Sequence, residues 1–240
     1  MSIEIEIVND GVQTTLNDAF AYLVEVDERF SMYKEDSEIS RINKHSHILE
    51  NVGMSEEMKE VFALAEKTKR ETNGYFNMKR PDGKIDPSGI VKGWAIRNTS
   101  ELIRKAGYKN FFVNAGGDIA MSGKNTDVGE WSVGIKNPFS QKEIIKVVYP
   151  RGKGIATSGS YIRGDHIYNP HQPEQKIQDI VSITVIGPDV LEADRFATAA
   201  FAMGNGGIAF IENLKGFEGY MIDKDGIATT TSGFAVYTSP

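Results

Sequence analysis

The sequence predicts a protein of the α+β class, in which largely antiparallel sheets pack against long helices. The predicted strands occur in hairpin-like runs, and long helical segments separate these runs. A doubly wound parallel sheet would require regular alternation of strands and helices, which this chain lacks. Because no repeat of fixed period, low-complexity linker or domain boundary is evident, we expect a single domain over residues 1–240.

Five helices are expected from apolar residues that recur at helical spacing. The first covers residues 16–30, and a polar segment follows in which Ser37 can cap a short helix. Two long helices are expected over 55–74 and 88–107, and a buried one over 192–204. Each of these three ends at a glycine, the residue most common just past a helix C-terminus.

The first strand is expected at the N-terminus, where isoleucine alternates with glutamate as in a half-buried strand. The stretch FFVNAGGDIAMSG predicts a strand, a tight turn and a second strand. Further strands are expected at WSVGIK, IIKVVYP, GIAT, IVSITVIG and FEGYMID. These runs favour antiparallel pairing, since short connections join many of them.

Composition excludes several classes of site and partner. The net charge of −6 provides no basic surface for nucleic acid or for an anionic membrane. Because the chain has no cysteine, it can form no disulfide, thiolate metal site or thiol nucleophile. No window approaches the ~18 apolar residues of a membrane span, so we expect no stable membrane insertion. The N-terminus lacks the features of a signal peptide, which favours the cytoplasm, although a trimmed exported form would look the same.

The buried helix EADRFATAAFAMG carries two oxygen-bearing side chains, Asp194 and Thr198, four residues apart. That spacing places them on one helix face. Hard oxygen donors suit Mg²⁺ rather than zinc or copper, and Mg²⁺ commonly accepts few protein ligands when a substrate phosphate and waters complete its octahedron. The alternative is structural: Asp194 caps the first turn and Thr198 bonds back to a carbonyl group.

Two glycine-containing segments are candidate anion sites. In KIDPSGIVKGWA, Ser88 and Gly89 precede or begin a helix and Lys92 follows one turn later, so amides and a cation meet. A capped helix with a solvated lysine is the alternative. In NAGGDIAMSG, the pair Gly116 and Gly117 would allow a ligand to approach the backbone closely. The spacing of the glycines fits neither the Rossmann nor the Walker pattern. The alternative is that this pair only forms a hairpin turn.

The segment GIATSGSYIRGDHIYNP contains Ser158 and His166 but no GxSxG elbow, so a serine triad is disfavoured. The four histidines lack metal-ligand spacing, which disfavours zinc. His166 is a candidate acid or base. Together these residues indicate a phosphate-bearing ligand with Mg²⁺, and by themselves they do not distinguish a nucleotide, a flavin and a sugar phosphate.

The order of six segments resembles the ApbE family, the FAD:protein FMN transferases. The resemblance runs from about residue 25 to 235 and rests on SMYKEDSEISRIN, KIDPSGIVKGWA, VNAGGDIAMSG, GIATSGSYIRGDHIYNP, SITVIGPDVLEADRFATAAFAMG and DKDGIATTTSGF. It implies an α+β architecture of the T-fold type. It also implies Mg²⁺-dependent transfer of FMN from FAD to a threonine or serine hydroxyl of an acceptor protein, with release of AMP. Some members instead hydrolyse FAD.

The resemblance also implies roles for individual residues. Asp194 and Thr198 match the family's metal-binding DxxxT, with the backbone carbonyl of Ala156 as a third ligand, and Asp194 is thereby catalytic. His166 is the candidate for activating the attacking hydroxyl. The residues expected to contact FAD lie in four segments: Met32, Tyr33, Asn43, Asp86, Ser88, Gly89, Lys92, Gly116, Gly117, Asp118, Thr157 and Ser158.

Two departures from the family pattern bear on function. Asn169 stands where an aspartate is usual, and HQPEQK follows where a threonine–glycine turn is common, so the geometry of this loop is in question. The family's frequent lipobox and export signal are missing. Three functions therefore remain open: FMN transfer to a protein, FAD pyrophosphatase activity, and flavin binding without turnover.

Overall fold

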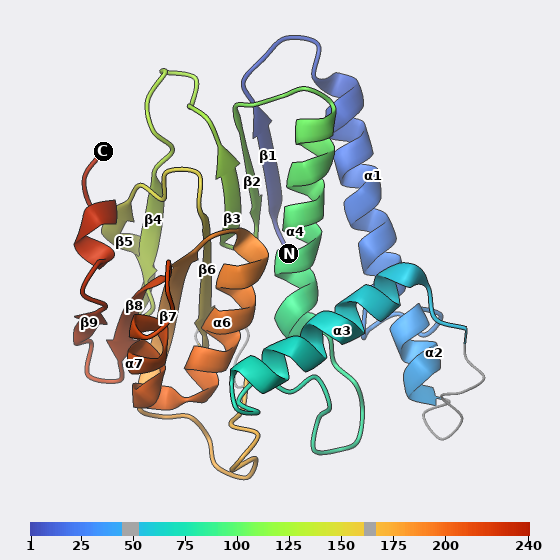
Figure 1. Ribbon diagram of the computed structural model, residues 1–240, viewed down its shortest axis with the longest axis vertical. Coiled ribbons are helices and arrows are strands. Elements are labelled where there is room, and N and C mark those ends of the chain that lie inside the picture. Colours follow the sequence, from blue (N-terminus) through green and yellow to red (C-terminus); the bar gives the residue numbers. More distant parts are fainter. Residues whose placement is uncertain (45–52, 161–166) are drawn as a thin grey trace.

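A computed structural model describes residues 1–44, 53–160 and 167–240, and every structural statement below concerns these residues. Its main sheet has seven antiparallel strands in the order β1-β2-β3-β6-β7-β8-β9, and β4 and β5 form a separate two-stranded sheet (Figure 1). The strands are β1 (Ile3–Ile7), β2 (Phe111–Ala115), β3 (Asp118–Ser122), β4 (Val133–Asn137), β5 (Ser140–Val148), β6 (Gly154–Gly159), β7 (Ile180–Gly187), β8 (Glu218–Asp223) and β9 (Ala228–Thr230).

Three long helices lie side by side on one face of this sheet, and a fourth crosses near their ends (Figure 1). The three are α1, α4 and α6, and the crossing helix is α3. The helices are α1 (Gln13–Phe30), α2 (Glu38–Lys44), α3 (Glu56–Glu71), α4 (Ser88–Lys105), α6 (Val190–Ala202) and α7 (Gly207–Glu212). The α+β class with antiparallel sheets is therefore confirmed. No helix in the described ranges is long and apolar enough to cross a membrane.

The five predicted helices and the predicted strands are present, and their ends follow local chemistry. Ser37 Oγ accepts a hydrogen bond from Ser40 N at 3.1 Å, and Ser55 caps α3 by accepting from Met58 N at 3.2 Å. Past the end of α4, Gly107 has φ +95°, and its amide donates to the Arg104 carbonyl at 2.9 Å. This left-handed residue ends the helix as expected for glycine.

The sequence analysis did not predict α7 and β9. Six residues are too few for a clear helical period, and α7 follows a glycine-rich stretch. All three residues of β9 are exposed, so this strand has no alternation of buried and exposed positions. Both elements form because they pack on β8, a contact that no local pattern encodes.

The tight turn between β2 and β3 is a two-residue hairpin, as expected. Ala115 pairs with Asp118, and the two residues between them, Gly116 and Gly117, have φ of +63° and +100°. Two successive left-handed residues define the type I′ turn, which glycine adopts without steric cost. The turn fixes the position of Asp118 at the start of β3.

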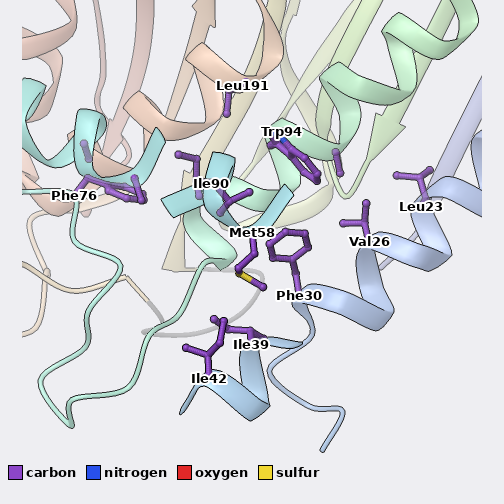
Figure 2. Packing of buried hydrophobic residues seen from close by; sticks show 14 residues of the cluster. Leu23, Val26, Phe30, Ile39, Ile42, Met58, Phe76, Ile90, Trp94 and Leu191 are labelled. Atoms are coloured by element: carbon purple, nitrogen blue, oxygen red, sulfur yellow. The ribbon is translucent and has the colours of Figure 1, made fainter. Parts of the chain in front are cut away.

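A cluster of buried apolar residues joins α1, α2, α3 and α4 and reaches α6 (Figure 2). Trp94 of α4 is only 1% exposed, and its ring meets that of Phe30 edge-on with centroids 5.5 Å apart. Burying each large side chain of this kind contributes about 1.5–3 kcal/mol. This cluster fixes the N-terminal half of α4 relative to α1 and α3.

One loop residue has an unfavourable backbone conformation. Val128 is 79% exposed and has φ +60°, a region that β-branched residues rarely adopt. We expect Val128→Gly to stabilise the protein by about 1 kcal/mol, because relief of left-handed strain outweighs the entropy that glycine adds to the unfolded chain. Thermal unfolding should show a Tm increase of about 2–4 °C. The control Thr126→Gly, in the same loop, should not raise the Tm, and equal effects of both substitutions would refute the strain argument.

Candidate active site

The described residues enclose a large cleft between the C-terminal end of α1, the segment 75–86, the N-terminal end of α4 and residues 167–173. Its volume is about 1480 Å³, which exceeds the roughly 300–1,000 Å³ of pockets for drug-sized ligands. Seven of the predicted site residues line it: Met32, Tyr33, Asp86, Ser88, Gly89, Lys92 and Thr198. The cleft can therefore hold a ligand as large as a dinucleotide.

The N-terminal end of α4 forms part of the cleft wall. Asp86 Oδ1 accepts a hydrogen bond from Ser88 N at 3.0 Å, so Asp86 holds the first turn, while Ser88 is itself the first helical residue. Lys92 follows one turn later. Helix N-termini carry partial positive charge, and a lysine in the first turns adds to it. This end of the cleft suits an anion such as a phosphate group.

Asp194 and Thr198 share one face of their helix, as their spacing predicts, and this face contacts α4. Asp194 Oδ2 accepts a hydrogen bond from Gly93 N at 2.7 Å, and Thr198 Oγ1 donates to the Gly89 carbonyl at 3.4 Å. The alternative in which Asp194 caps its own helix is wrong. The cap of α6 is Asp189, whose Oδ1 accepts from the Glu192 amide at 2.9 Å.

A buried charge cluster lies behind Thr198. Lys92 Nζ is 2.6 Å from Asp118 Oδ2 and 3.7 Å from Asp194 Oδ1. The two aspartates are 1% and 3% exposed. Burial raises the pKa of Asp194 from 3.8 to about 8, and the negative charge of Asp118 adds to this effect, while the Lys92 ammonium opposes it. Because its pKa is about 8, the Asp194 carboxyl group is largely protonated at neutral pH, and the Lys92 ammonium then balances the charge of Asp118. Ionisation of Asp194 would leave a negative charge that a further cation would neutralise.

Strand β6 brings the ATSG segment to the same place. The Thr157 amide donates to Asp118 Oδ1 at 3.1 Å, and Thr157 Oγ1 lies 2.8 Å from Thr184 Oγ1. Ala156, which precedes Thr157 in β6, is fully buried, and Ser158, which follows it, is 7% exposed. Segments distant in sequence therefore meet at the Lys92 ammonium and the two carboxylates.

These residues fit a hard divalent cation. Asp118 Oδ2 is buried, and no described donor meets it in hydrogen-bond geometry, although Lys92 pairs with it electrostatically. Hydroxyl, carboxylate and carbonyl oxygens are the ligands that Mg²⁺ prefers. No group of three or more His, Cys, Asp or Glu side chains gathers anywhere in the described ranges.

The structure places some predicted residues beside the cleft rather than in its wall. Asn43 bonds the backbone of Ile85 through both ends of its amide: Nδ2 donates to the Ile85 carbonyl at 2.9 Å and Oδ1 accepts from the Ile85 amide at 2.8 Å. It thereby holds the residue before Asp86. Its Nδ2 also donates to Met32 Sδ at 3.8 Å. Gly117 borders open space, because a Cβ placed there would have no neighbour within 4 Å. His166 lies outside the described residues.

Asn169 fulfils the local role that an aspartate could have. Its Oδ1 accepts a hydrogen bond from His171 N at 2.9 Å, and its carbonyl accepts from Gln172 N at 3.0 Å. An aspartate carboxylate would accept the same amide. The turn at residues 169–172 therefore forms with asparagine in this position.

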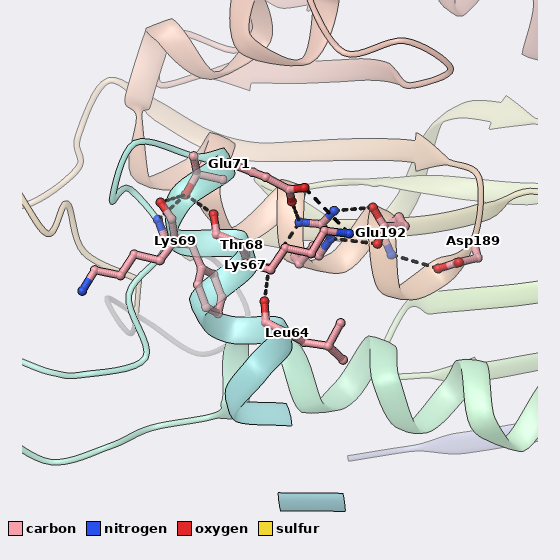
Figure 3. Close-up of polar contacts among 10 residues, drawn as sticks. Leu64, Lys67, Thr68, Lys69, Glu71, Asp189 and Glu192 are labelled. Atoms are coloured by element: carbon pink, nitrogen blue, oxygen red, sulfur yellow. Dashed lines mark hydrogen bonds and ion pairs between the residues drawn. The ribbon is translucent and has the colours of Figure 1, made fainter. Parts of the chain in front are cut away.

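Arg195, the neighbour of Asp194, was not among the predicted residues. Arg195 is 3% exposed, its Nε donates to Glu192 Oε1 at 3.0 Å, and its guanidinium pairs with Glu71 of α3. Figure 3 shows Glu192 of α6 between Glu71 and Thr68 of α3 on one side and Asp189, the cap residue of α6, on the other. An arginine within a run of small buried residues, with a glutamate three positions earlier, was the available signal. The network fixes α6 against α3.

Close packing of α4 on α6 requires glycine at position 93. A Cβ on Gly93 would lie 2.7 Å from Asp194 Cβ and 2.9 Å from the Leu191 Cα. We expect Gly93→Ala to destabilise the protein by about 1–3 kcal/mol and to displace Asp194, since α4 and α6 must separate. Chemical denaturation and FAD turnover would be measured together. Gly107→Ala, which meets no atom within 4 Å, is the control; it should lower stability through its φ without lowering kcat, and an equal loss of kcat would contradict this account.

Comparison with known proteins identifies the family. The family model "ApbE family" matches residues 1–80 and 78–221. The chain belongs to the ApbE family. Both the Asp194–Thr198 pair and the α4 N-terminus thus belong to an ApbE fold, in agreement with the resemblance found in the sequence.

Curated ApbE relatives are named FAD:protein FMN transferase. The relative from Klebsiella pneumoniae is 30% identical over 169 residues, which are 67% of this chain and 47% of the relative. The relative from Escherichia coli is 29% identical over 69% of this chain and 48% of its own length. The chain thus spans about half the length of these relatives.

Solved ApbE structures share the fold over almost the whole chain. The flavin transferase ApbE from Vibrio cholerae superposes with a TM-score of 0.84 at 25% identity, covering 98% of this chain and 95% of that one. The ApbE protein from Thermotoga maritima gives a TM-score of 0.85 at 20% identity, covering 98% and 94%. The expected ApbE architecture is therefore confirmed.

Proposed function

We propose that residues 1–240 act as one unit in the Mg²⁺-dependent transfer of FMN from FAD to a threonine or serine hydroxyl of an acceptor protein, with release of AMP. The curated relatives are named FAD:protein FMN transferase, which supports transfer of FMN from FAD to a protein. The observation that supports it most is the meeting of Lys92, Asp118, Asp194 and Thr198 beside the N-terminal end of α4. A pyrophosphate needs such an arrangement of a cation, a helix N-terminus and hard oxygen ligands.

In this proposal the chain binds FAD with its pyrophosphate against Ser88, Gly89 and Lys92. The partial positive charge of the α4 N-terminus and the Lys92 ammonium attract its oxygens. Asp194, Thr198 and the Ala156 carbonyl would hold Mg²⁺, which when bound neutralises charge on the phosphoryl group and on the departing AMP. Tyr33, 97% exposed at the cleft, has a free ring face on which a flat isoalloxazine can stack.

The acceptor hydroxyl oxygen forms the new bond to the FMN phosphorus, and the bond from that phosphorus to the AMP oxygen breaks. The hydroxyl proton must leave as the bond forms, and His166 is the residue that we propose takes it. The buried charge cluster orients Asp194 before substrate arrives, since Gly93 N and Lys92 contact its two oxygens. Such positioning supplies most of the catalysis in phosphoryl transfer.

The test is incubation of the protein with FAD, Mg²⁺ and a panel of threonine- and serine-bearing peptides. A fluorescent covalent adduct together with AMP supports transfer. Free FMN and AMP without an adduct would instead assign FAD pyrophosphatase activity, in which water attacks. FAD that stays bound and unchanged would reduce the protein to a flavin binder and would contradict the proposal.

A further inference from the structure

The segment of residues 167–173, named the strap here, forms part of the cleft wall. Ile167, Tyr168, Pro170 and Pro173 of the strap line the cleft, as do Tyr75 and Phe76. The prolines fix φ at two of these positions and so limit the conformations of the strap. The strap is also where this chain departs from the usual family pattern, with HQPEQK following Pro170.

The strap is joined to residues 73–79 at two points. Tyr168 Oη donates a hydrogen bond to the Lys79 carbonyl at 3.2 Å. His171 Nε2 lies 2.9 Å from the Asn73 carbonyl oxygen, and its ring meets the Tyr75 ring edge-on at 4.6 Å and 70°. Both contacts reach the segment that follows α3.

The second contact shows which ring nitrogen of His171 carries a hydrogen. A carbonyl oxygen can only accept, so Nε2 must carry the hydrogen. The backbone beneath the ring is shaped to receive it: Gly74 has φ +84°, and a Cβ there would lie 3.4 Å from His171 Cε1. The ring therefore sits on a glycine, with one edge on a carbonyl and one on an aromatic ring.

We propose that His171 and Tyr168 are positioning residues that fasten the strap to residues 73–79, so that both segments form a fixed part of the cleft wall, and thereby set the affinity for the nucleotide substrate. The inference rests on the proposed function, because it takes FAD as the ligand. His171 itself is exposed and does not line the cleft, so it acts through Tyr75, Tyr168 and Pro170. If this part of the wall is already ordered in the free protein, less binding free energy is spent on ordering it when the nucleotide binds.

The test compares FAD affinity and turnover in single variants. His171→Ala should raise the Kd for FAD about tenfold, and kcat should stay within about twofold, since the loss of one hydrogen bond and one ring contact falls on binding. His171→Gln, whose Nε2 can donate to the same carbonyl, should restore most of the affinity. His171→Phe, which keeps only the ring contact, should be intermediate. Glu174→Ala, an exposed position just past the strap, is the control and should bind as wild type.

A double variant tests whether the two contacts fasten one element. Tyr168→Phe removes only the hydroxyl and should raise the Kd about fivefold. The double variant Tyr168→Phe with His171→Ala should raise the Kd by less than the product of the two single increases. Once one contact has been lost, the strap is already released, so the other contact contributes less to FAD binding. Unchanged affinity in His171→Ala, a fall in kcat alone, failure of glutamine to rescue, or independent effects in the double variant would each overturn the proposal.

Failure of the strap and failure of the proposed function give different results. If wild type binds no FAD, the proposed function falls. Amide hydrogen exchange then tests the strap on its own: His171→Ala should increase exchange in residues 167–173 relative to Glu174→Ala. Exchange that is equal in the two variants would overturn the fastening role, whatever the ligand.

Discussion

Asp194→Ala is expected to lower kcat for FAD turnover by about a thousandfold, because it removes the carboxylate that would hold Mg²⁺ beside the pyrophosphate. Asp189→Ala is the matched control on the same helix. Asp189 only caps α6, so its loss should cost about 1 kcal/mol of stability and leave kcat within about threefold of wild type. Release of AMP from FAD, followed over a range of Mg²⁺ concentrations, measures both. Activity of Asp194→Ala with unchanged Mg²⁺ dependence would contradict the assignment.

The second large effect concerns pH and the metal-free protein. The pKa of Asp194 is raised from 3.8 to about 8 by burial, so the folded state keeps a proton that the unfolded state releases. The unfolded state binds fewer protons between these values, and the stability contributed by protonated Asp194 is therefore lost as pH rises from about 4 to about 8. Asp194→Asn cannot ionise. It should exceed wild type in stability by about 2 kcal/mol or more at pH 9, and the two should converge near pH 4.

Denaturant titrations of both proteins in the presence of a chelator would measure this difference. Addition of Mg²⁺ at pH 8 should then stabilise wild type and not Asp194→Asn, because metal binding favours the ionised carboxylate. A stability difference that does not change with pH, or equal stabilisation of both proteins by Mg²⁺, would show that Asp194 is not the titrating ligand.

Features set by local geometry could be predicted from the sequence. Residues four apart on a helix share a face, so Asp194 and Thr198 were expected to point together, and both contact α4. Paired glycines allow a type I′ turn, so the hairpin at Gly116 and Gly117 was expected too. Helix caps were predictable only where the helix start was clear: the sequence offered Asp194 as a cap of the buried helix, whereas the cap is Asp189.

Features set by tertiary contacts could not be predicted. The Arg195–Glu71 pair joins residues 124 positions apart, and Asn43 meets Ile85 across 42 positions. Lys92 lies between two carboxylates that come from a hairpin and from another helix. No periodicity or spacing encodes such a meeting. Family resemblance supplied Asp118 and Lys92 as separate FAD contacts, but their ion pair and the raised pKa of Asp194 follow only from the fold.

We propose that a divalent ion held by Asp194 and Thr198 lies against the diphosphate of FAD. Phosphorus NMR of bound FAD, with paramagnetic Mn²⁺ in place of Mg²⁺, would test this position. Both phosphate resonances should broaden strongly in wild type, and the broadening should be lost in Asp194→Asn at equal FAD occupancy. Broadening that persists in Asp194→Asn, or phosphate resonances that stay sharp in wild type while Mn²⁺ is bound, would contradict it.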